Sequence, residues 1–309
     1  MTYDLSHTTT YEYTSMVSLS HHTMRLLPRN LERQKCLGSE FEIDPQPGVL
    51  KSHTDYFGND MTFLTVEGAH RTLVIASHSQ VQVEPFTPPN ATKTPAWETV
   101  RDCCREEDPN ESLMAREFTY ASPHIKQQPD FAAYALLSFA ADRPVLDAVL
   151  DLTARIYREF KFDPKATTIA TPLDKVLKQR RGVCQDFAHL EIACLRSMGI
   201  PARYVSGYLE TDPPPGKARL AGADASHAWI SFYCPGSGWI DVDPTNNLLP
   251  SNRHITVAWG RDYSDVSPIR GVILGSGEHS LKVAVDVIPI HEPRLPFKAG
   301  QSQSQSQSL

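Results

Sequence analysis

Residues 180–190 read Arg180-Arg181-Gly182-Val183-Cys184-Gln185-Asp186-Phe187-Ala188-His189-Leu190, and the fold is organised around this stretch. From Cys184 to Met198 the sequence is apolar around most of a helical circumference, which predicts a helix buried on most sides. Gly199 suits the position just after a helix, and Pro201 prevents its continuation. The chain therefore places a cysteine at the start of a central buried helix.

Two residues further along the chain have the types that a cysteine nucleophile requires. His227 follows Cys184 by forty-three residues on a segment that alternates as a strand, and Asp243 follows sixteen residues later at the end of the next predicted strand. A thiol nucleophile needs a base that takes its proton and a group that orients the base. A helix N-terminus and an adjacent imidazole both favour the thiolate. The candidate catalytic residues are therefore Cys184 as nucleophile, His227 as base and Asp243 as orienter.

Each candidate also has an ordinary structural explanation. Cysteine is commonly a small buried apolar residue, a histidine on a strand is usually a satisfied polar group, and Asp-Pro-Thr is a common turn. Spacing alone leaves both interpretations open. A metal site built from Cys184, His189 and His227 is a third interpretation, but no C-x-x-C or H-x-x-x-H motif accompanies these residues. We expect neither a metal nor another cofactor.

Neighbouring residues receive structural interpretations. Asp186 lies in the first turn of the predicted helix, where a carboxylate suits the helix dipole, so we interpret it as a cap. His189 lies five residues after Cys184 and faces another side of the helix. Asp241 alternates with Asp243 along the strand and should point to the opposite side. Four more side chains are expected in the core, in loops or in the wall of a cleft: Trp229, Trp239, Arg261 and Tyr263.

The rest of the chain divides by its periodicity. Residues 1–86 alternate as short strands separated by proline and glycine turns, which predicts an antiparallel, β-sandwich-like domain. Residues 87–144 form a linker and a helical segment, and residues 145–290 form a core domain that begins with an amphipathic helix. Residues 291–309 form a disordered tail rich in glutamine and serine. After the central helix we expect strands at 202–210, 225–234, 239–242, 271–274 and 281–290.

Composition limits the classes of partner. The net charge is −6 and the pI is near 6.1, which argues against nucleic acid or an anionic membrane as a partner. No apolar run approaches the roughly eighteen residues that span a bilayer, and the N-terminus lacks the pattern of a secretory signal. We therefore expect a cytoplasmic protein. The six cysteines have no framework spacing, and we expect reduced thiols.

Several of these motifs, taken together, resemble a known family. Residues 182–190 and 199–208 read Gly-Val-Cys-Gln-Asp-Phe-Ala-His-Leu and Gly-Ile-Pro-Ala-Arg-Tyr-Val-Ser-Gly-Tyr; residues 227–229, 238–246 and 260–268 complete the pattern. The sequence is similar to the bacterial transglutaminase-like core, and the N-terminal strands resemble the β domain that precedes it. The resemblance implies an α+β fold, with a papain-like core in which a central helix packs on an antiparallel sheet. It carries the nucleophile to Cys184, the base to His227 and the orienter to Asp243.

The resemblance also implies a reaction. The thiol would attack an amide carbonyl, commonly that of a glutamine side chain, and form a thioester that passes to an amine or to water. The expected partners are a protein or peptide amide substrate and a primary amine acceptor, whereas the oligomeric state is left open. Two alternatives are a cysteine protease or amidase that acts only as a hydrolase, and a non-catalytic binding module on the same fold. Calcium dependence is not implied, because no acidic loop has the spacing of calcium ligands.

Overall fold

The computed structural model describes residues 1–105, 111–211, 222 and 224–291. The chain divides into two compact units: unit 1 comprises residues 1–84, 209–225 and 268–309, and unit 2 comprises residues 85–208 and 226–267. The predicted disordered tail, residues 291–309, lies outside the described residues except for residue 291. Within those residues, no helix is both long enough and apolar enough to span a bilayer.

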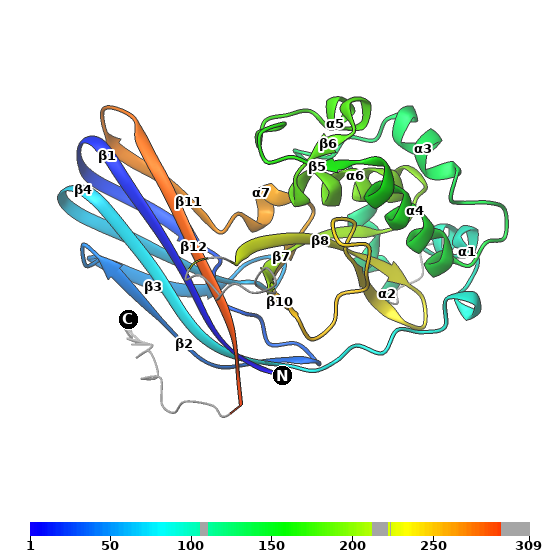
Figure 1. Cartoon of the computed structure of the whole chain (residues 1–309), viewed down its shortest axis with the longest axis horizontal. Helices are drawn as coiled ribbons and strands as arrows, with labels where there is room; N and C mark the ends of the chain where they lie inside the picture. The colour runs from blue at the N-terminus through cyan, green and yellow to red at the C-terminus, as the bar shows by residue number, and fades with distance from the viewer. Residues whose placement is uncertain (106–110, 212–221, 223, 292–309) are drawn as a thin grey trace, which may run out of the picture. The chain divides into compact units, whose positions relative to one another are not determined.

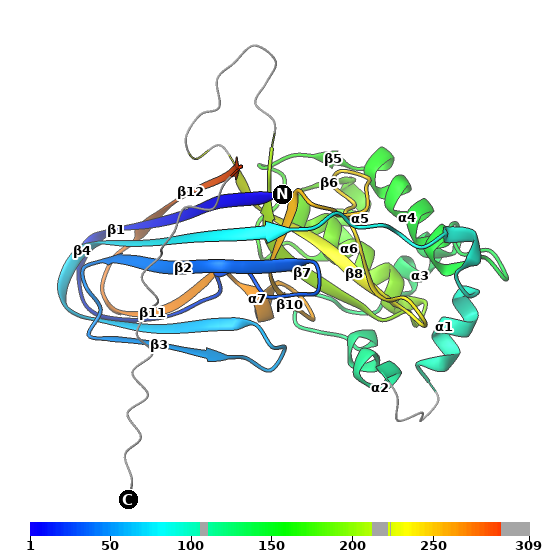
Figure 2. The same cartoon turned by 90° about the horizontal axis from the view of Figure 1, so that it is seen from below.

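Unit 1 is a single antiparallel sheet built on two very long strands. The central pair is β1 (Thr2–Met24) and β4 (Asp60–Val83), which run side by side (Figures 1 and 2). The four shorter strands are β2 (Gln34–Asp44), β3 (Val49–Thr54), β11 (Ile269–Gly275) and β12 (His279–Ile290). The first half of β1 pairs with β12 and its second half pairs with β11, while β4 pairs in the same divided way with β2 and β3.

The sheet folds on itself where the register of the central pair shifts. The β1–β4 register is interrupted between Glu12 and Leu19, as expected where bulges increase the bend of a strand. Side chains from both sides of the bend share one core: Ile43 and Ile75 come from one half, and Leu64 and Val66 come from the other. This arrangement confirms the predicted antiparallel, β-sandwich-like domain.

The strand pairing corrects one predicted boundary. We predicted residues 145–290 as one core domain, but β11 and β12 both pair with β1 and belong to unit 1. The physical reason is that long strands leave backbone groups that only another strand can satisfy. The last two strands of the chain provide those partners, and local periodicity carries no information about such distant pairing. The predicted linker and helical segment, residues 87–144, belongs to unit 2.

Unit 2 combines helices with a four-stranded sheet of order β10-β7-β8-β9. The strands are β7 (Ala202–Leu209), β8 (Ala225–Cys234), β9 (Gly238–Val242) and β10 (His254–Gly260). The helices are η1 (Ala91–Lys93), α1 (Trp97–Cys103), α2 (Glu111–Arg116), η2 (Glu117–Thr119), α3 (Pro129–Leu136), α4 (Val145–Glu159), α5 (Leu173–Gln179), α6 (Cys184–Ser197) and α7 (Tyr263–Val266). Figure 1 shows α3, α4, α5 and α6 grouped along one side of this sheet.

The central helix α6 forms where it was predicted and is buried nearly all round. Its neighbours include α4, whose Thr153 hydroxyl contacts Glu191, and β7, whose Tyr204 ring lies 4.9 Å from that of His189. At its C-terminal end the buried Arg196 guanidinium donates to the backbone carbonyl of Ala202 at 2.8 Å. Burial of this apolar helix supplies much of the driving force that assembles unit 2.

Local geometry fixes the start and the end of α6. Two short strands, β5 (Lys161–Phe162) and β6 (Arg181–Gly182), pair in parallel just before the helix. A β-carbon on Gly182 would lie 2.6 Å from the Asp186 carboxylate, so only glycine allows this approach. The chain leaves the helix through Gly199 at φ +79°, a conformation that glycine adopts without strain. The predicted place of Gly199 just after the helix is therefore confirmed.

Candidate active site

Cys184 is the first residue of α6 and is half-buried. The position gives its sulfur the unpaired backbone N–H groups and the positive end of the helix dipole. Asp186 accepts a hydrogen bond from the backbone N–H of Val183 at 2.8 Å and one from the Thr167 hydroxyl at 2.6 Å. Asp186 is therefore the predicted cap of the helix. All six cysteines, each within the described residues, are free thiols as predicted.

The structure brings the three candidate catalytic residues together. His227 projects from β8, and its Nε2 lies 2.7 Å from Oδ2 of Asp243, the residue that follows β9. The side chain of Cys184 hydrogen-bonds to the same imidazole. Because Nε2 is engaged by the carboxylate, Nδ1 is the ring nitrogen left to face the thiol. Cys184, His227 and Asp243 therefore occupy consecutive positions along one hydrogen-bonded chain.

The electrostatics of this group match those roles. Burial alone would lower the pKa of His227, but its hydrogen bonds with Asp243 and Cys184 outweigh burial and raise the pKa well above its usual range. Burial would raise the pKa of Asp243, but hydrogen bonds from His227 and His254 hold it below its usual range. Asp243 is therefore an ionised carboxylate whose charge stabilises an imidazolium at His227.

Sequence reasoning missed two partners of Asp243. His254, the first residue of β10, has its Nε2 at 3.1 Å from Oδ2 of Asp243. The side-chain amide of Asn246 donates to the same oxygen at 2.7 Å. Asn246 lies in the Asp-Pro-Thr-Asn turn that the sequence singled out, but its role could be seen only in three dimensions. No sequence motif marks His254, because it reaches the site from a different strand.

The same group satisfies the spacing of a metal site, but an ionised Asp243 carboxylate requires a proton on each imidazole nitrogen that faces it. The ligand atoms of His227, Asp243 and His254 lie within 4.8 Å of one another. Three N–H groups point at Oδ2 of Asp243, from His227, His254 and Asn246. A cation would have to replace both imidazole protons and displace the amide. We therefore interpret the group as a hydrogen-bonded network around a carboxylate.

The residues that we interpreted as structural have structural partners. His189 is buried, and its Nε2 accepts a hydrogen bond from the backbone N–H of Tyr263 at 3.1 Å. Asp241 accepts from the indole N–H of Trp229 at 3.0 Å and does not contact His227 through any described hydrogen bond. Arg261 forms an ion pair with Asp265. The choice of Asp243 over Asp241 as partner of His227 agrees with this geometry.

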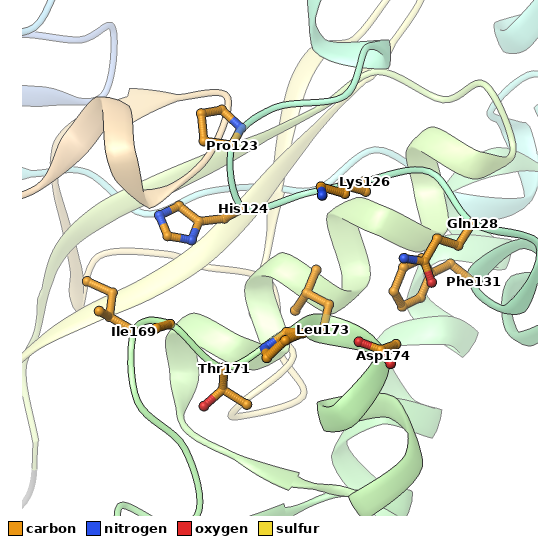
Figure 3. A pocket seen from close by; sticks show the side chains of 11 residues that line it. Pro123, His124, Lys126, Gln128, Phe131, Ile169, Thr171, Leu173 and Asp174 are labelled. Atoms are coloured by element: carbon orange, nitrogen blue, oxygen red, sulfur yellow. The ribbon is translucent and has the colours of Figure 1, made fainter.

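A pocket borders the helix that carries Cys184. Its volume is about 360 Å³, and it lies between residues 123–131 and residues 169–174, as Figure 3 shows. His124 in its wall stacks on His189 of α6, with ring centroids 5.4 Å apart and planes at 10°. Apolar side chains (Phe131, Ile169 and Leu173) and charged ones (Lys126 and Asp174) share the lining. The pocket therefore offers apolar surface and both signs of charge, and one of its walls packs on α6 at His189.

Comparisons with known proteins identify two regions. Residues 3–82 match the family model described as the bacterial transglutaminase-like N-terminal region. Residues 135–244 match that of the transglutaminase-like superfamily. The first match lies in unit 1, and the second includes Cys184, His227 and Asp243.

The chain is also similar to individual proteins, some over the whole length and some over one part. The uncharacterized protein Rv2569c of Mycobacterium tuberculosis is 42% identical over 301 residues, which are 95% of this chain and 94% of that protein. A protein-glutamine gamma-glutamyltransferase of Pseudomonas aeruginosa is 34% identical over 107 residues, 32% of this chain and 16% of that protein. A crystal structure of a candidate cysteine protease from Cytophaga hutchinsonii aligns with 96% of this chain and 94% of its own chain, with a TM-score of 0.70. The two sequences are 21% identical, so this similarity is one of fold.

Proposed function

The chain belongs to the bacterial transglutaminase-like proteins, and we propose that it is a cysteine-dependent acyltransferase that attacks the amide carbonyl of a glutamine side chain. The observation that carries the proposal is the hydrogen-bonded chain from Cys184 through His227 to Asp243. The Pseudomonas aeruginosa relative, named as a protein-glutamine gamma-glutamyltransferase, supports the choice of a glutamine donor.

The first half-reaction forms a thioester. The Cys184 thiolate, paired with the imidazolium of His227, attacks the carboxamide carbon, and the oxygen takes up the negative charge. Backbone N–H groups in the first turn of α6 lie where they could stabilise that oxyanion. As the carbon–nitrogen bond breaks, His227 gives its proton to the leaving nitrogen, and ammonia departs. The products are an acylated Cys184 and a neutral imidazole.

The second half-reaction returns the enzyme to its starting state. A primary amine attacks the thioester carbon, and His227 takes the proton that the amine loses. The carbon–sulfur bond breaks, an isopeptide bond forms, and the thiolate–imidazolium pair is restored. Water in place of the amine would give a carboxylate, so the same residues support deamidation. Asp243 keeps the imidazole in one orientation through both steps.

The pocket beside α6 is the place we propose for the peptide around the reactive glutamine. A peptide needs apolar contacts and hydrogen-bonding or charged groups for its backbone and side chains. The pocket supplies the first through Phe131, Ile169 and Leu173 and the second through Lys126 and Asp174.

Incorporation of a labelled primary amine into a glutamine-containing protein tests the proposal. We expect incorporation by the wild-type protein, none by Cys184→Ala and near-normal incorporation by Cys103→Ala. Cys103 is the matched control because it is also a half-buried free thiol of unit 2. Loss of activity in both variants would contradict the assignment of the nucleophile.

Two other results would redirect the proposal. Release of ammonia or cleavage of the backbone, without incorporation of the amine, would identify a hydrolase and contradict transfer. Uniformly slow alkylation of all six thiols by iodoacetamide near neutral pH would favour a non-catalytic binding module. A catalytic Cys184 should be alkylated first and should slow sharply in His227→Ala.

A further inference from the structure

We propose that His254 is a positioning residue of this site: its Nε2–H group holds the Asp243 carboxylate in the orientation that aligns His227 with Cys184. The inference rests on the proposed function, because alignment matters only if Cys184 reacts. It assigns a role to a residue that lies twenty-seven positions after His227 and on a different strand, β10. His254 makes no described hydrogen bond to Cys184 or to the ring of His227. Its hydrogen bond is to Asp243, and its ring lies 6.0 Å, centroid to centroid, from that of His227.

Asp243 is held by five hydrogen bonds. Its Oδ1 accepts from the backbone N–H groups of Thr245 at 2.9 Å and Asn246 at 3.2 Å, as in an Asx turn. Its Oδ2 accepts from His227 at 2.7 Å, from His254 at 3.1 Å and from the Asn246 side chain at 2.7 Å. The carboxylate is fully buried, so these five donors replace the water that an exposed carboxylate would have.

These contacts determine where the imidazole protons lie. The hydrogen bonds hold the pKa of Asp243 below its usual range, so its carboxylate carries no proton to donate. His227 and His254 must therefore each carry a hydrogen on Nε2. For His227 this places the basic lone pair, or the second proton of the imidazolium, on Nδ1 facing Cys184. If the Asp243 carboxylate were held less firmly, the His227 ring would be less restricted both in its tautomer and in its orientation.

His254 is itself held rigidly by aromatic packing. Its ring meets that of Trp229 edge to face, with centroids 5.2 Å apart and planes at 84°. Trp229 is fully buried, donates to Asp241 and lies over Gly207, where a β-carbon would come within 2.5 Å of its ring. A side chain with so little freedom can fix a hydrogen-bond partner at low entropic cost. The packing therefore suits His254 to positioning.

Other titratable groups near the carboxylate are few among the described residues. His227 contacts it from β8 and His254 from β10, and the Asp243 charge contributes, after burial, to the raised pKa of Glu191 on α6. Cys184 approaches His227 from the start of α6. A change in pH dependence after substitution of His254 therefore passes through the Asp243–His227–Cys184 chain, through the ring contact of His254 with His227 or through Glu191.

The test compares two substitutions at His254 by the rate at which iodoacetamide alkylates Cys184. His254→Phe keeps an aromatic ring against Trp229 but removes the donor, whereas His254→Gln can place an amide N–H near the former Nε2. Near neutral pH we expect His254→Phe to slow alkylation about tenfold, the factor that corresponds to one pKa unit. His254→Gln should recover most of the wild-type rate. The loss in His254→Phe should shrink above pH ~8.5, where an ordinary thiol ionises unaided.

Two further variants keep the test decisive if His254→Phe folds poorly. Asn246→Ala removes a different donor to Oδ2 from an exposed turn, and it should show the same pH-dependent loss to a smaller degree. His189→Gln removes another buried histidine of unit 2, and it should lower thermal stability while leaving the pH profile of alkylation unchanged. Peptide mass spectrometry distinguishes Cys184 from the other five thiols.

The outcomes separate this inference from the proposed function. Slow alkylation of Cys184 in the wild-type protein would overturn both. Rapid alkylation in the wild type, with an unchanged rate in folded His254→Phe, would overturn the positioning role alone. An equal loss in His254→Phe and His254→Gln at every pH would also overturn it, since packing rather than the hydrogen bond would then be the cause.

Discussion

Two buried histidines, one in each unit, show how differently the chain treats the same side chain. His22 in β1 is 3% exposed and His227 in β8 is 9% exposed. Neither ring nitrogen of His22 has a hydrogen-bond partner among the described residues, and burial, followed by the charges of His70 and His21, lowers its pKa to about 4. His227 has Asp243 and Cys184 as partners, and its pKa is raised.

Burial alone makes an imidazole less basic, and a neighbouring ionised carboxylate restores its basicity. Transfer of an imidazolium from water into the protein is unfavourable unless an opposite charge or an acceptor compensates. His22 lacks that compensation and stays neutral at neutral pH, which suits a packed core. His227 gains it from an ionised carboxylate that five donors hold in place. The raised basicity of His227 is therefore created by its surroundings.

Removal of that carboxylate is expected to have the largest effect. Asp243→Asn keeps the shape of the side chain but deletes its charge, so His227 becomes a buried imidazole without a counter-ion, as His22 is. We expect the rate of Cys184 alkylation near neutral pH to fall about 10²- to 10⁴-fold, the upper figure being that for the same change in a serine-protease triad. The rate of amine incorporation should fall in parallel. Stopped-flow alkylation and the amine assay measure both.

Asp241→Asn is the matched control for that substitution. It makes the same chemical change two residues earlier on β9, where the carboxylate accepts from Trp229 and not from His227. We expect alkylation close to the wild-type rate. A similar loss in both variants would show that the strand, and not the charge beside His227, is responsible.

This comparison also marks what sequence could and could not predict. Residues 182–199 were predictable because their glycines, their apolar face and the cysteine all act locally, and α6 begins and ends where expected. Spacing left the roles of His227 and Asp243 open, and the family resemblance assigned them. Strand alternation only favoured Asp243 over Asp241, because alternate side chains point to opposite faces. His254 was missed because its partner lies eleven residues away around a turn, and no periodicity encodes that contact.

Unit 1 was harder to predict for a related reason. Along β1 the inward-facing residues include His7 and Thr9 as well as Tyr3 and Leu5, so the apolar alternation that marks a half-buried strand is broken. The strand therefore continues far beyond the short alternating segments that the sequence showed. The pairing of β1 with β11 and β12 joins residues at least 245 positions apart, as in the pair Met24 and Ile269. Local patterns could give the strands but not their partners.

Glu191 is a buried acid that forms no ion pair with the described residues, and it can be compared with the buried Asp243. It lies on α6, two turns after Cys184, and is fully buried. The Thr153 hydroxyl lies 2.8 Å from the carbonyl of Val149 and 2.7 Å from Oε1 of Glu191, yet it has only one hydrogen to donate. A proton on Glu191 satisfies both contacts, since the carboxyl then donates to Thr153 and Thr153 donates to Val149. Burial raises the pKa of Glu191 to about 8, in agreement with this arrangement.

Glu191→Gln is expected to have the next largest effect, on stability. In the unfolded chain the carboxyl loses its proton near pH 4.5, whereas in the folded protein it does so near 8. The folded state therefore binds more protons between these values, and stability falls as pH rises through this window by at most about 1.4 kcal/mol per unit. The variant should lose this slope. Urea unfolding at several pH values between 4.5 and 8 measures the slope of stability against pH. Glu40→Gln, which changes an exposed glutamate of β2, is the control and should keep the wild-type slope.

His22→Phe is expected to have the smallest effect, and with the opposite sign of pH dependence. In the unfolded chain the imidazole of His22 binds a proton near pH 6.5, whereas in the folded protein it does so only near pH 4. The unfolded state therefore binds more protons in between, and wild-type stability falls as pH drops through that window by at most about 1.4 kcal/mol per unit. The stability of His22→Phe should fall less than that of the wild type as the pH drops through this window. His53→Phe, which changes an exposed residue of β3, should lose stability as the wild type does. Equal sensitivity in His22→Phe and wild type would mean that His22 finds a proton-stabilising partner, and the contrast with His227 would then rest on Asp243 less than we infer.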